Sequence, residues 1–284
     1  MNAIELSHVS KSFRDFSLED LNFILPEGCI CGLVGENGAG KTTMIRLLTG
    51  ALRADSGDLK TLGADVSAKD FYKTKQDIGV VLDDAWFPGM MTALQVERVM
   101  EKTYVNWDGV LYHRFLEKFS LPEKKYFKDY SRGMRMKLAI AVALSHDPKL
   151  LVLDEATAGL DPLVRDEVLD VFNEYTREEH HSILMSSHIL SDLEKISDYI
   201  AFLHKGRLLF CEEKDRLLEA YGIFEGTVDQ ADSLMEGAIV HREGNGFGGV
   251  RALVKRDMVP EGFSLTHASI EDIILNLVKE ENRK

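Results

Sequence analysis

A glycine-rich loop that closes on a lysine and two threonines constrains this chain more than any other feature. It fits the pattern G-x-x-x-x-G-K-[ST] and consists of Gly35, Glu36, Asn37, Gly38, Ala39, Gly40, Lys41, Thr42 and Thr43. The apolar run at residues 29–34 predicts a buried strand before it, and residues 42–49 predict an amphipathic helix after it. In this setting backbone N–H groups and the helix dipole hold phosphates, while the lysine and a hydroxyl meet the terminal phosphate and Mg²⁺. The alternative is a glycine turn without a ligand.

A second apolar run, Leu150-Leu-Val-Leu, ends on two acids, Asp154 and Glu155. A phosphate loop needs an acid at the end of a neighbouring strand to hold Mg²⁺, and Asp154 fits this role together with Thr42. Glu155 then lies where a general base would polarise an attacking water. The alternative is a strand end with two solvated acids.

A histidine, His188, follows the next predicted strand, residues 182–185. Ligands of parallel α/β sheets gather at the carboxyl ends of the strands, where both Glu155 and His188 fall. We therefore expect His188 to sense the γ-phosphate or to orient the water, although a histidine after a strand is also a common structural residue.

The composition narrows the class of protein. With 47 Asp and Glu against 34 Lys and Arg, the net charge of the 284 residues is −13, which argues against nucleic acid as a partner. No apolar stretch approaches the roughly 20 residues that span a bilayer, and residues 1–20 lack the apolar core of a signal peptide. Three cysteines, Cys29, Cys31 and Cys211, fit buried positions in a reducing compartment. We therefore expect a cytoplasmic protein.

The order of predicted elements indicates an α/β fold. Strand-like and helical segments alternate, which implies a largely parallel sheet with crossover helices, and helical periodicity dominates residues 92–146. Beyond residue 214 glycine becomes frequent between short strand-like pieces, and an amphipathic segment, residues 269–281, closes the chain. The sequence thus predicts a main domain, residues 1–214, and a small α+β accessory domain, residues 215–284.

Over roughly residues 2–212 these motifs resemble the nucleotide-binding subunit of an ABC transporter. Residues 35–43 resemble the Walker A loop, 150–155 the Walker B strand and 158–161 the D-loop, and His188 resembles the switch histidine. The resemblance implies a P-loop NTPase of ABC type, with a parallel-sheet core, an antiparallel β subdomain and an inserted helical subdomain at about 86–146. It also implies ATP and Mg²⁺ as cofactors, a nucleotide-site role for Asp161, and stacking of Phe13 on adenine. A half-buried Phe13 in a turn is the alternative.

The signature loop departs from the family pattern. The usual Leu-Ser-Gly-Gly-Gln aligns with Tyr-Ser-Arg-Gly-Met at residues 130–134, where Ser131 and Gly133 survive and can form an anion site at a helix N-terminus. In the family this loop completes the ATP site of a second ATPase subunit, in a homodimer or heterodimer. Arg132 would then lie near the γ-phosphate of the partner's ATP, or it points to solvent.

The second departure is Asp83, where the family usually carries glutamine. A carboxylate there is able to reach Mg²⁺ or its water, because carboxylate oxygens are good ligands of hard cations. A surface-loop acid is the alternative.

The loop Tyr-Ser-x-Gly-Met and the tail at residues 268–274 resemble bacterial export systems for antibiotics, peptides and similar amphipathic compounds. This implies that the chain powers export through a separate transmembrane permease and lies at the inner face of the membrane. Residues 86–91, Trp-Phe-Pro-Gly-Met-Met, fit either a docking site for that permease or plain core. Two alternatives remain: a regulatory ABC ATPase acting on ribosomes or DNA, and a half-site subunit that depends on a second ATPase chain.

Overall fold

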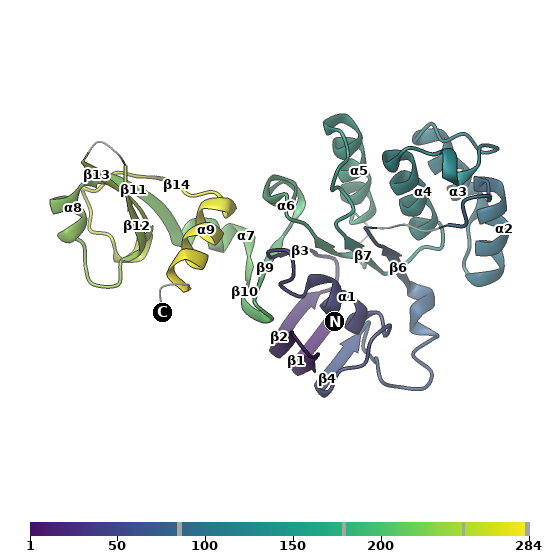
Figure 1. The fold of residues 1–284 in the computed structure, drawn as a ribbon, viewed down its shortest axis with the longest axis horizontal. Helices are drawn as coiled ribbons and strands as arrows, with labels where there is room; N and C mark the ends of the chain where they lie inside the picture. The colour runs from purple at the N-terminus through teal and green to yellow at the C-terminus, as the bar shows by residue number, and fades with distance from the viewer. Residues whose placement is uncertain (84–86, 178–179, 246–247, 282–284) are drawn as a thin grey trace. The chain divides into compact units, whose positions relative to one another are not determined.

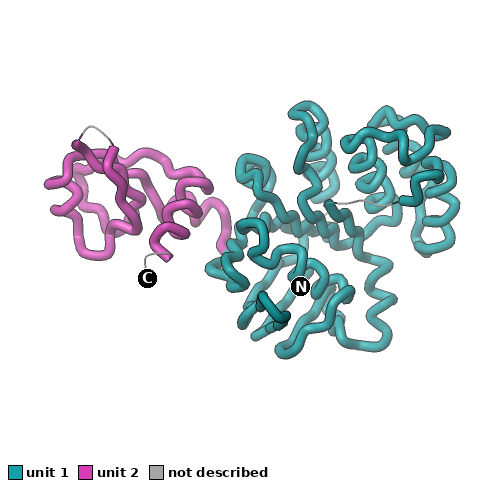
Figure 2. Tube along the Cα trace, viewed as in Figure 1, with its two compact units in different colours: residues 1–211 teal, residues 212–284 magenta. Residues whose placement is uncertain are grey.

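The protein is described by a computed structural model that covers residues 1–83, 87–177, 180–245 and 248–281. The chain divides into two compact units, Met1–Cys211 and Glu212–Lys284 (Figure 2). The boundary expected after residue 214 falls just beyond this division.

A six-stranded sheet forms the centre of the first unit, in the order β10-β9-β3-β8-β7-β6. Its strands are β3 (Ile30–Val34), β6 (Ile78–Val81), β7 (Leu150–Asp154), β8 (Ser182–Ser186), β9 (Tyr199–His204) and β10 (Arg207–Glu213). From β6 to β9 every neighbouring pair is parallel. Strands β3, β7 and β8 are buried along their whole length, which explains their continuous apolar runs.

The parallel direction has a direct consequence for the site. Because the strands point the same way, the segments that follow β3, β7, β8 and β6 emerge at one edge of the sheet. The glycine-rich loop, the acid pair, His188 and Asp83 all lie in these segments.

Helices cover both faces of this sheet. In Figure 1, α5 (Pro162–Tyr175) and α6 (Leu190–Ile196) lie on one side, and α1 (Lys41–Leu48) lies on the other with a second sheet. That sheet is antiparallel and has the order β2-β1-β4-β5. Its strands are β1 (Asn2–Ser12), β2 (Ser17–Pro26), β4 (Ser56–Thr61) and β5 (Ala64–Asp65). Buried Leu, Ile, Val and Phe side chains join both sheets and α1 in one core.

A group of helices stands beside β6 and β7 (Figure 1): α2 (Ala93–Thr103), α3 (Gly109–Lys118) and α4 (Arg132–Leu144). Each begins at a side-chain cap, as N-cap preferences predict, with Thr92, Asp108 and Ser131 accepting a bond from a backbone N–H of the first turn. Buried apolar residues fill α4 from Leu138 to Leu144, and α4 contacts β6. The helical insertion and the parallel-sheet core that the sequence predicts are thus confirmed.

The second unit has a sheet and a core of its own. The antiparallel order is β12-β13-β11-β14, formed by β11 (Tyr221–Thr227), β12 (Ile239–Gly244), β13 (Gly249–Lys255) and β14 (Leu265–His267). Its helices are α7 (Lys214–Ala220), α8 (Val228–Asp232) and α9 (Ile270–Glu281). Phe224, Val250 and Val254 are among its buried core residues. Within the described ranges of the whole chain, no helix is long and apolar enough to span a bilayer.

Candidate nucleotide site

Two positions of the glycine-rich loop, Gly35 and Gly40, need glycine because the backbone there passes very close to its neighbours. A Cβ on Gly35 would lie 2.4 Å from the carbonyl oxygen of Leu203. Gly40 has a φ of +112°, and a Cβ there would lie 2.5 Å from Leu18 Cδ2. Helix α1 starts directly after Gly40, without a side-chain cap. Its first backbone N–H groups, which have no acceptor inside the helix, are thus left to bind an anion.

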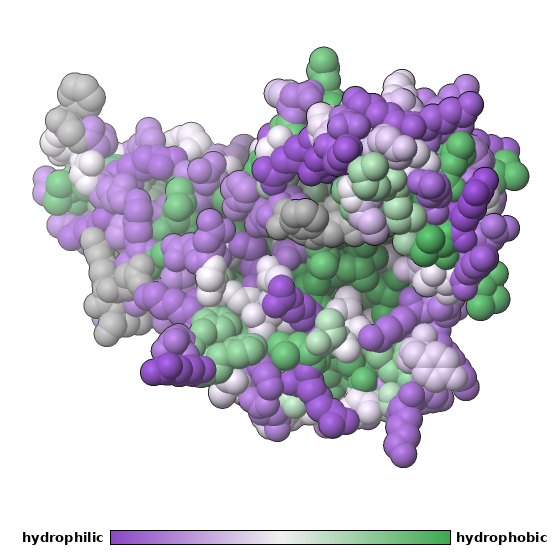
Figure 3. Space-filling view, turned by 45° about the vertical axis from the view of Figure 1, so that its right-hand side comes forward, coloured by the Kyte–Doolittle hydropathy of each residue, from purple (hydrophilic) through white to green (hydrophobic). Residues whose placement is uncertain are grey.

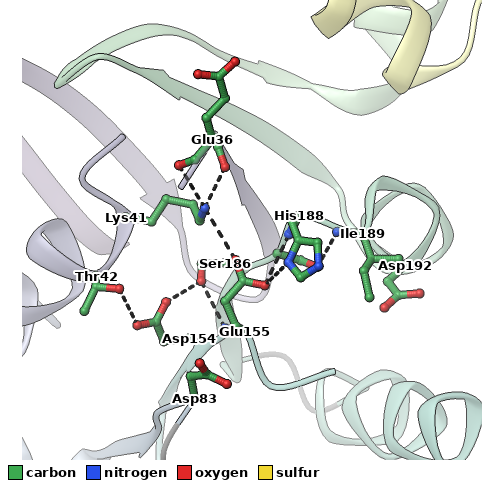
Figure 4. A network of polar contacts seen from close by, with 12 residues as sticks. Glu36, Lys41, Thr42, Asp83, Asp154, Glu155, Ser186, His188, Ile189 and Asp192 are labelled. Atoms are coloured by element: carbon green, nitrogen blue, oxygen red, sulfur yellow. Dashed lines mark hydrogen bonds and ion pairs between the residues drawn. The ribbon is translucent and has the colours of Figure 1, made fainter. Parts of the chain in front are cut away.

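Lys41 brings a buried positive charge to this loop (Figure 4). Its Nζ donates to the carbonyl oxygen of Gly35 at 2.6 Å and lies 3.4 Å from Glu155 Oε1. The residue is 6% exposed. A buried ammonium needs anionic or hydrogen-bonding partners, which these oxygens supply, and a phosphate on the loop would be a further anionic partner.

Three oxygen-bearing side chains meet at the ends of α1, β7 and β8. Thr42 Oγ1 donates to Asp154 Oδ2 at 2.7 Å, and Ser186 Oγ donates to Asp154 Oδ1 at 2.6 Å (Figure 4). Asp154 is therefore fixed through both oxygens beside the loop. Hydroxyl and carboxylate oxygens are the ligands that Mg²⁺ prefers, so Thr42 and Asp154 fit that ion.

Glu155 connects the lysine to the histidine. Its Oε2 lies 2.6 Å from His188 Nδ1, and its backbone N–H donates to Ser186 Oγ at 3.1 Å. With φ at 53°, the residue is in the left-handed region, which is uncommon for a non-glycine residue. Such a conformation persists only where the surroundings enforce it, and here the Ser186 bond and the ion pairs do so. The carboxylate is left with 16% exposure at the edge of the sheet, where a general base has to be.

Phe13 is linked to the glycine-rich loop by a second aromatic residue, Phe16, which lies between them. Its ring stacks on Phe16 at a centroid distance of 6.4 Å, and Phe16 Cζ would lie 2.8 Å from a Cβ on Gly40. Phe13 is 46% exposed, so its ring is open to a base.

The contacts of the signature-loop residues are with α4, the loop before α5 and α5 itself, and not with the glycine-rich loop. Ser131 Oγ accepts from the N–H of Met134 in α4, and Gly133 lies near Leu160 and Val164. Asp161 caps α5 by accepting from the N–H of Val164.

Asp83 and Arg132, the two departures, lie against each other. Arg132 Nη2 donates to Asp83 Oδ1 at 2.9 Å. The remaining loop residues Glu36, Asn37 and Gly38 are exposed, and Thr43 is half-buried.

Known proteins with similar sequences show the family of this chain. A profile of the ABC transporter family matches residues 18–158. The protein YhcH of Bacillus subtilis (strain 168), an uncharacterised ABC transporter ATP-binding protein, is 35% identical over 72% of this chain and 68% of its own length. The chain belongs to the ABC transporter family. It is an ATP-binding subunit with the ATPase fold of that family.

Two further relatives of the ABC subunit have named transport roles. The lantibiotic transport ATP-binding protein SrtF of Streptococcus pyogenes is 32% identical over 75% of this chain and 91% of its own. The bacitracin transport ATP-binding protein BcrA of Enterococcus faecalis is 31% identical over 72% and 68%.

Solved structures match the ABC subunit as well. An ATP-binding subunit of an ABC transporter has a TM-score of 0.69 at 26% identity, covering 76% of this chain and 91% of that one. A dimeric cassette in a post-hydrolysis state with ADP and Pi has a TM-score of 0.67 at 21% identity, covering 74% and 98%, and shows the fold alone.

The sequence missed two residues of this site, Ser186 and Phe16. A serine inside an apolar strand gives no motif, and only its register opposite Asp154 could have indicated its role. Phe16 follows Phe13 by three residues, which is too weak a pattern to single out. Trp86, part of the expected docking segment, lies outside the described residues.

Proposed function

We propose that this ABC subunit hydrolyses ATP at the edge formed by β3, β7 and β8 and thereby powers transport through a separate membrane permease. The observation that carries the proposal is the continuous set of contacts from Lys41 through Glu155 to His188, beside the Thr42–Asp154 pair. Lys41 and the first N–H groups of α1 bind the phosphates. Glu155 accepts a proton from the attacking water, and His188 orients the Glu155 carboxylate.

Thr42 and Asp154 are the residues that would hold Mg²⁺ in this proposal, because their oxygens already meet at 2.7 Å. The ion neutralises phosphate charge when bound. Asp83 joins this set only if it leaves Arg132, to which it is hydrogen-bonded. Phe13 stacks on the adenine.

A second ATPase subunit completes the site in this proposal. Ser131 and Gly133 stand at the N-terminus of α4, and their contacts are with α4 itself and the start of α5 rather than with the glycine-rich loop. This leaves the anion-binding end of α4, together with Asp161, for the nucleotide of a partner chain.

The compound moved is proposed to be an antibiotic, peptide or similar amphipathic molecule, exported from the cytoplasm. The named roles of SrtF and BcrA support this class. The permease would contact the α2–α4 side, where hydrophobic side chains appear among hydrophilic ones (Figure 3). Met90, Val99 and Val110 are exposed there, and Phe87 packs edge-on against Phe127. The membrane location of the subunit would then come through the permease, with no nucleic acid involved.

Purified protein with Mg²⁺ and ATP tests the catalytic part. We expect phosphate release by the wild type, and a loss of at least about a hundredfold in Glu155→Gln because the general base is gone. The variant should still bind ATP and elute as a dimer in size-exclusion chromatography. Turnover that survives in Glu155→Gln would contradict the role of Glu155. Turnover that appears only after a second ATPase chain is added would indicate a heterodimer.

Affinity purification from the native membrane tests the transport part. A multi-spanning membrane protein should co-purify with the wild type, and Met90→Ser should uncouple transport while the isolated ATPase keeps its activity. Co-purification of ribosomes or DNA instead would support a regulatory ATPase.

A further inference from the structure

The two positions at which the chain departs from the family pattern form an ion pair with each other. Arg132 is the first residue of α4, and Asp83 lies two residues beyond the end of β6. Their side chains meet at 2.9 Å although 49 positions separate them in the sequence. A carboxylate in place of an amide and a guanidinium in place of a glycine are thus complementary changes.

The guanidinium of Arg132 also lies against the loop that follows Glu155. A Cβ on Gly159 would be 2.6 Å from Arg132 Nη1 and 3.0 Å from Arg132 Cζ. Gly159 has a φ of +68°, so the backbone turns there in a way that a larger residue would resist. One side chain of α4 therefore touches segments that emerge from both β6 and β7.

The neighbouring residue fixes the same turn of α4 from another side. A Cβ on Gly133 would lie 3.7 Å from Leu160 Cδ2 and 3.8 Å from Val164 Cγ1. Leu160 belongs to the loop that follows Glu155, and Val164 belongs to α5. The first turn of α4 is thus held between the end of β6 and the loop 155–161.

The ion pair contributes little to the stability of the fold. The side chains of Arg132 and Asp83 are 57% and 52% exposed, and exposed pairs are screened by water and salt. The ion pair instead affects the orientation of α4. A planar guanidinium between two loops restricts how α4 turns relative to the sheet edge that carries Asp154 and Glu155.

We infer that Arg132 is a positioning residue for ATP turnover, acting through Asp83. The pair holds the N-terminus of α4 in place against the ends of β6 and β7. Helices α2–α4 therefore move together with the sheet edge that carries Asp154 and Glu155. This inference rests on the proposed function for its kinetic consequence, whereas the contact itself is independent of turnover.

A charge-reversal cycle tests it, with Asp83→Arg, Arg132→Asp and the double variant. Each single change should lower kcat about two- to fivefold, the range that an exposed ion pair supports. The double variant should regain most of the loss. Amide hydrogen exchange of residues 131–135, measured without nucleotide, should speed up in the single variants and slow again in the double variant.

A matched control is the pair Lys118–Glu174, which also joins the helical segment to the core, with N and O 2.7 Å apart. It links α3 to α5 far along both helices, so Glu174→Gln should leave kcat and the exchange at residues 131–135 unchanged.

Three outcomes would overturn the inference. Arg132→Asp with unchanged kcat and exchange removes the positioning role. If Asp83→Arg lowers kcat and the double variant does not recover it, Asp83 has another role, such as binding Mg²⁺. If Glu174→Gln changes kcat and the exchange at residues 131–135 equally, the Arg132–Asp83 pair has no specific positioning role. A wild type without ATPase activity would overturn the proposed function, and the exchange cycle would still decide the pair.

Discussion

Ser186 determines the geometry of the catalytic edge without belonging to any motif. Its hydroxyl donates to Asp154 and accepts from the N–H of Glu155, so it fixes the two acids of the proposed site at once. The residue is fully buried at the carboxyl end of β8. The same N–H also donates to the Ser186 carbonyl oxygen at 3.1 Å, so Ser186 supports the left-handed backbone of Glu155 through two acceptors.

Ser186→Ala should lower turnover about ten- to a hundredfold, because a small misplacement of Glu155 is costly to catalysis. The free energy of unfolding should fall by about 1–3 kcal/mol, since the buried carboxylate of Asp154 loses a hydrogen-bond donor. Steady-state kinetics and urea denaturation measure the two effects.

Ser182 provides the control at the other end of the same strand. It is also fully buried, and its hydroxyl accepts from the N–H of Gly28 at 2.9 Å. Ser182→Ala should therefore cost similar stability and leave turnover unchanged. Equal losses of turnover in the two variants would mean that strand stability alone is being measured.

Elements of the chain are anchored at their ends by specific side chains. Helix α9 begins behind Ser269, whose hydroxyl accepts from the N–H of Asp272, while Asp272 Oδ2 accepts from the N–H of Ser269. Burial acts to raise the pKa of Asp272, but the bonds from Ser269 and the ion pair with Arg251 outweigh it and lower that pKa.

Ser269→Ala should lower the stability of the second unit by about 1 kcal/mol, because one N–H of α9 loses its acceptor. Hydrogen exchange in α9 measures the effect. Ser269→Thr, which keeps a hydroxyl, should exchange like the wild type, and identical exchange in the alanine variant would contradict the capping role.

His146 connects the end of α2 to the end of α4. Its ring stacks on Tyr104 at a centroid distance of 3.8 Å, and its Nε2 lies 3.4 Å from the carbonyl oxygen of Ile78. Burial lowers the pKa of His146, against a smaller opposing effect of its backbone hydrogen bonds.

The lowered pKa of His146 makes stability depend on pH. In the unfolded chain the histidine pKa is about 6.5, so as the pH falls the unfolded chain takes up this proton at a higher pH than the folded chain does. The contribution of His146 to the free energy of unfolding is therefore fully present above about pH 6.5 and is lost as the pH drops below that value. His146→Phe keeps the stack and removes the proton, so its stability should fall less between pH 7 and pH 5. A variant with the wild-type pH dependence would contradict this assignment.

At the scale of the whole molecule, the described site residues all belong to the first unit. The glycine-rich loop, Asp154, Glu155 and His188 lie before residue 211, and the second unit has a separate core around Phe224. Each unit therefore has the buried apolar surface that independent folding requires.

A chain that ends after Glu213 keeps β10 whole and should bind ATP with a Kd within about twofold of the full chain, because the site does not draw on the second unit. Fluorescence titration with an ATP analogue measures the Kd, and circular dichroism checks the fold. A folded truncation with much weaker binding would show that the second unit contributes to the site.

Local sequence patterns predict the fold class, which is confirmed, and the candidate residues of the nucleotide site, which remain a prediction. The loop at Gly35, the acids Asp154 and Glu155, and His188 each follow an apolar run, and strands that alternate with helices lie parallel. Local pattern therefore sufficed, because each of these residues is fixed by the element directly before it.

The contacts of each of these residues follow from the tertiary structure. The sheet order places Ser186 opposite Asp154, and the packing of α4 brings Arg132 to Asp83. Strands β11 and β14 also pair only within the folded second unit, where residues 222–224 lie beside residues 265–267. The physical reason is common to all three cases: the contacts join residues that are far apart in sequence, and the order of strands that brings them together is a property of the packed core rather than of any local pattern.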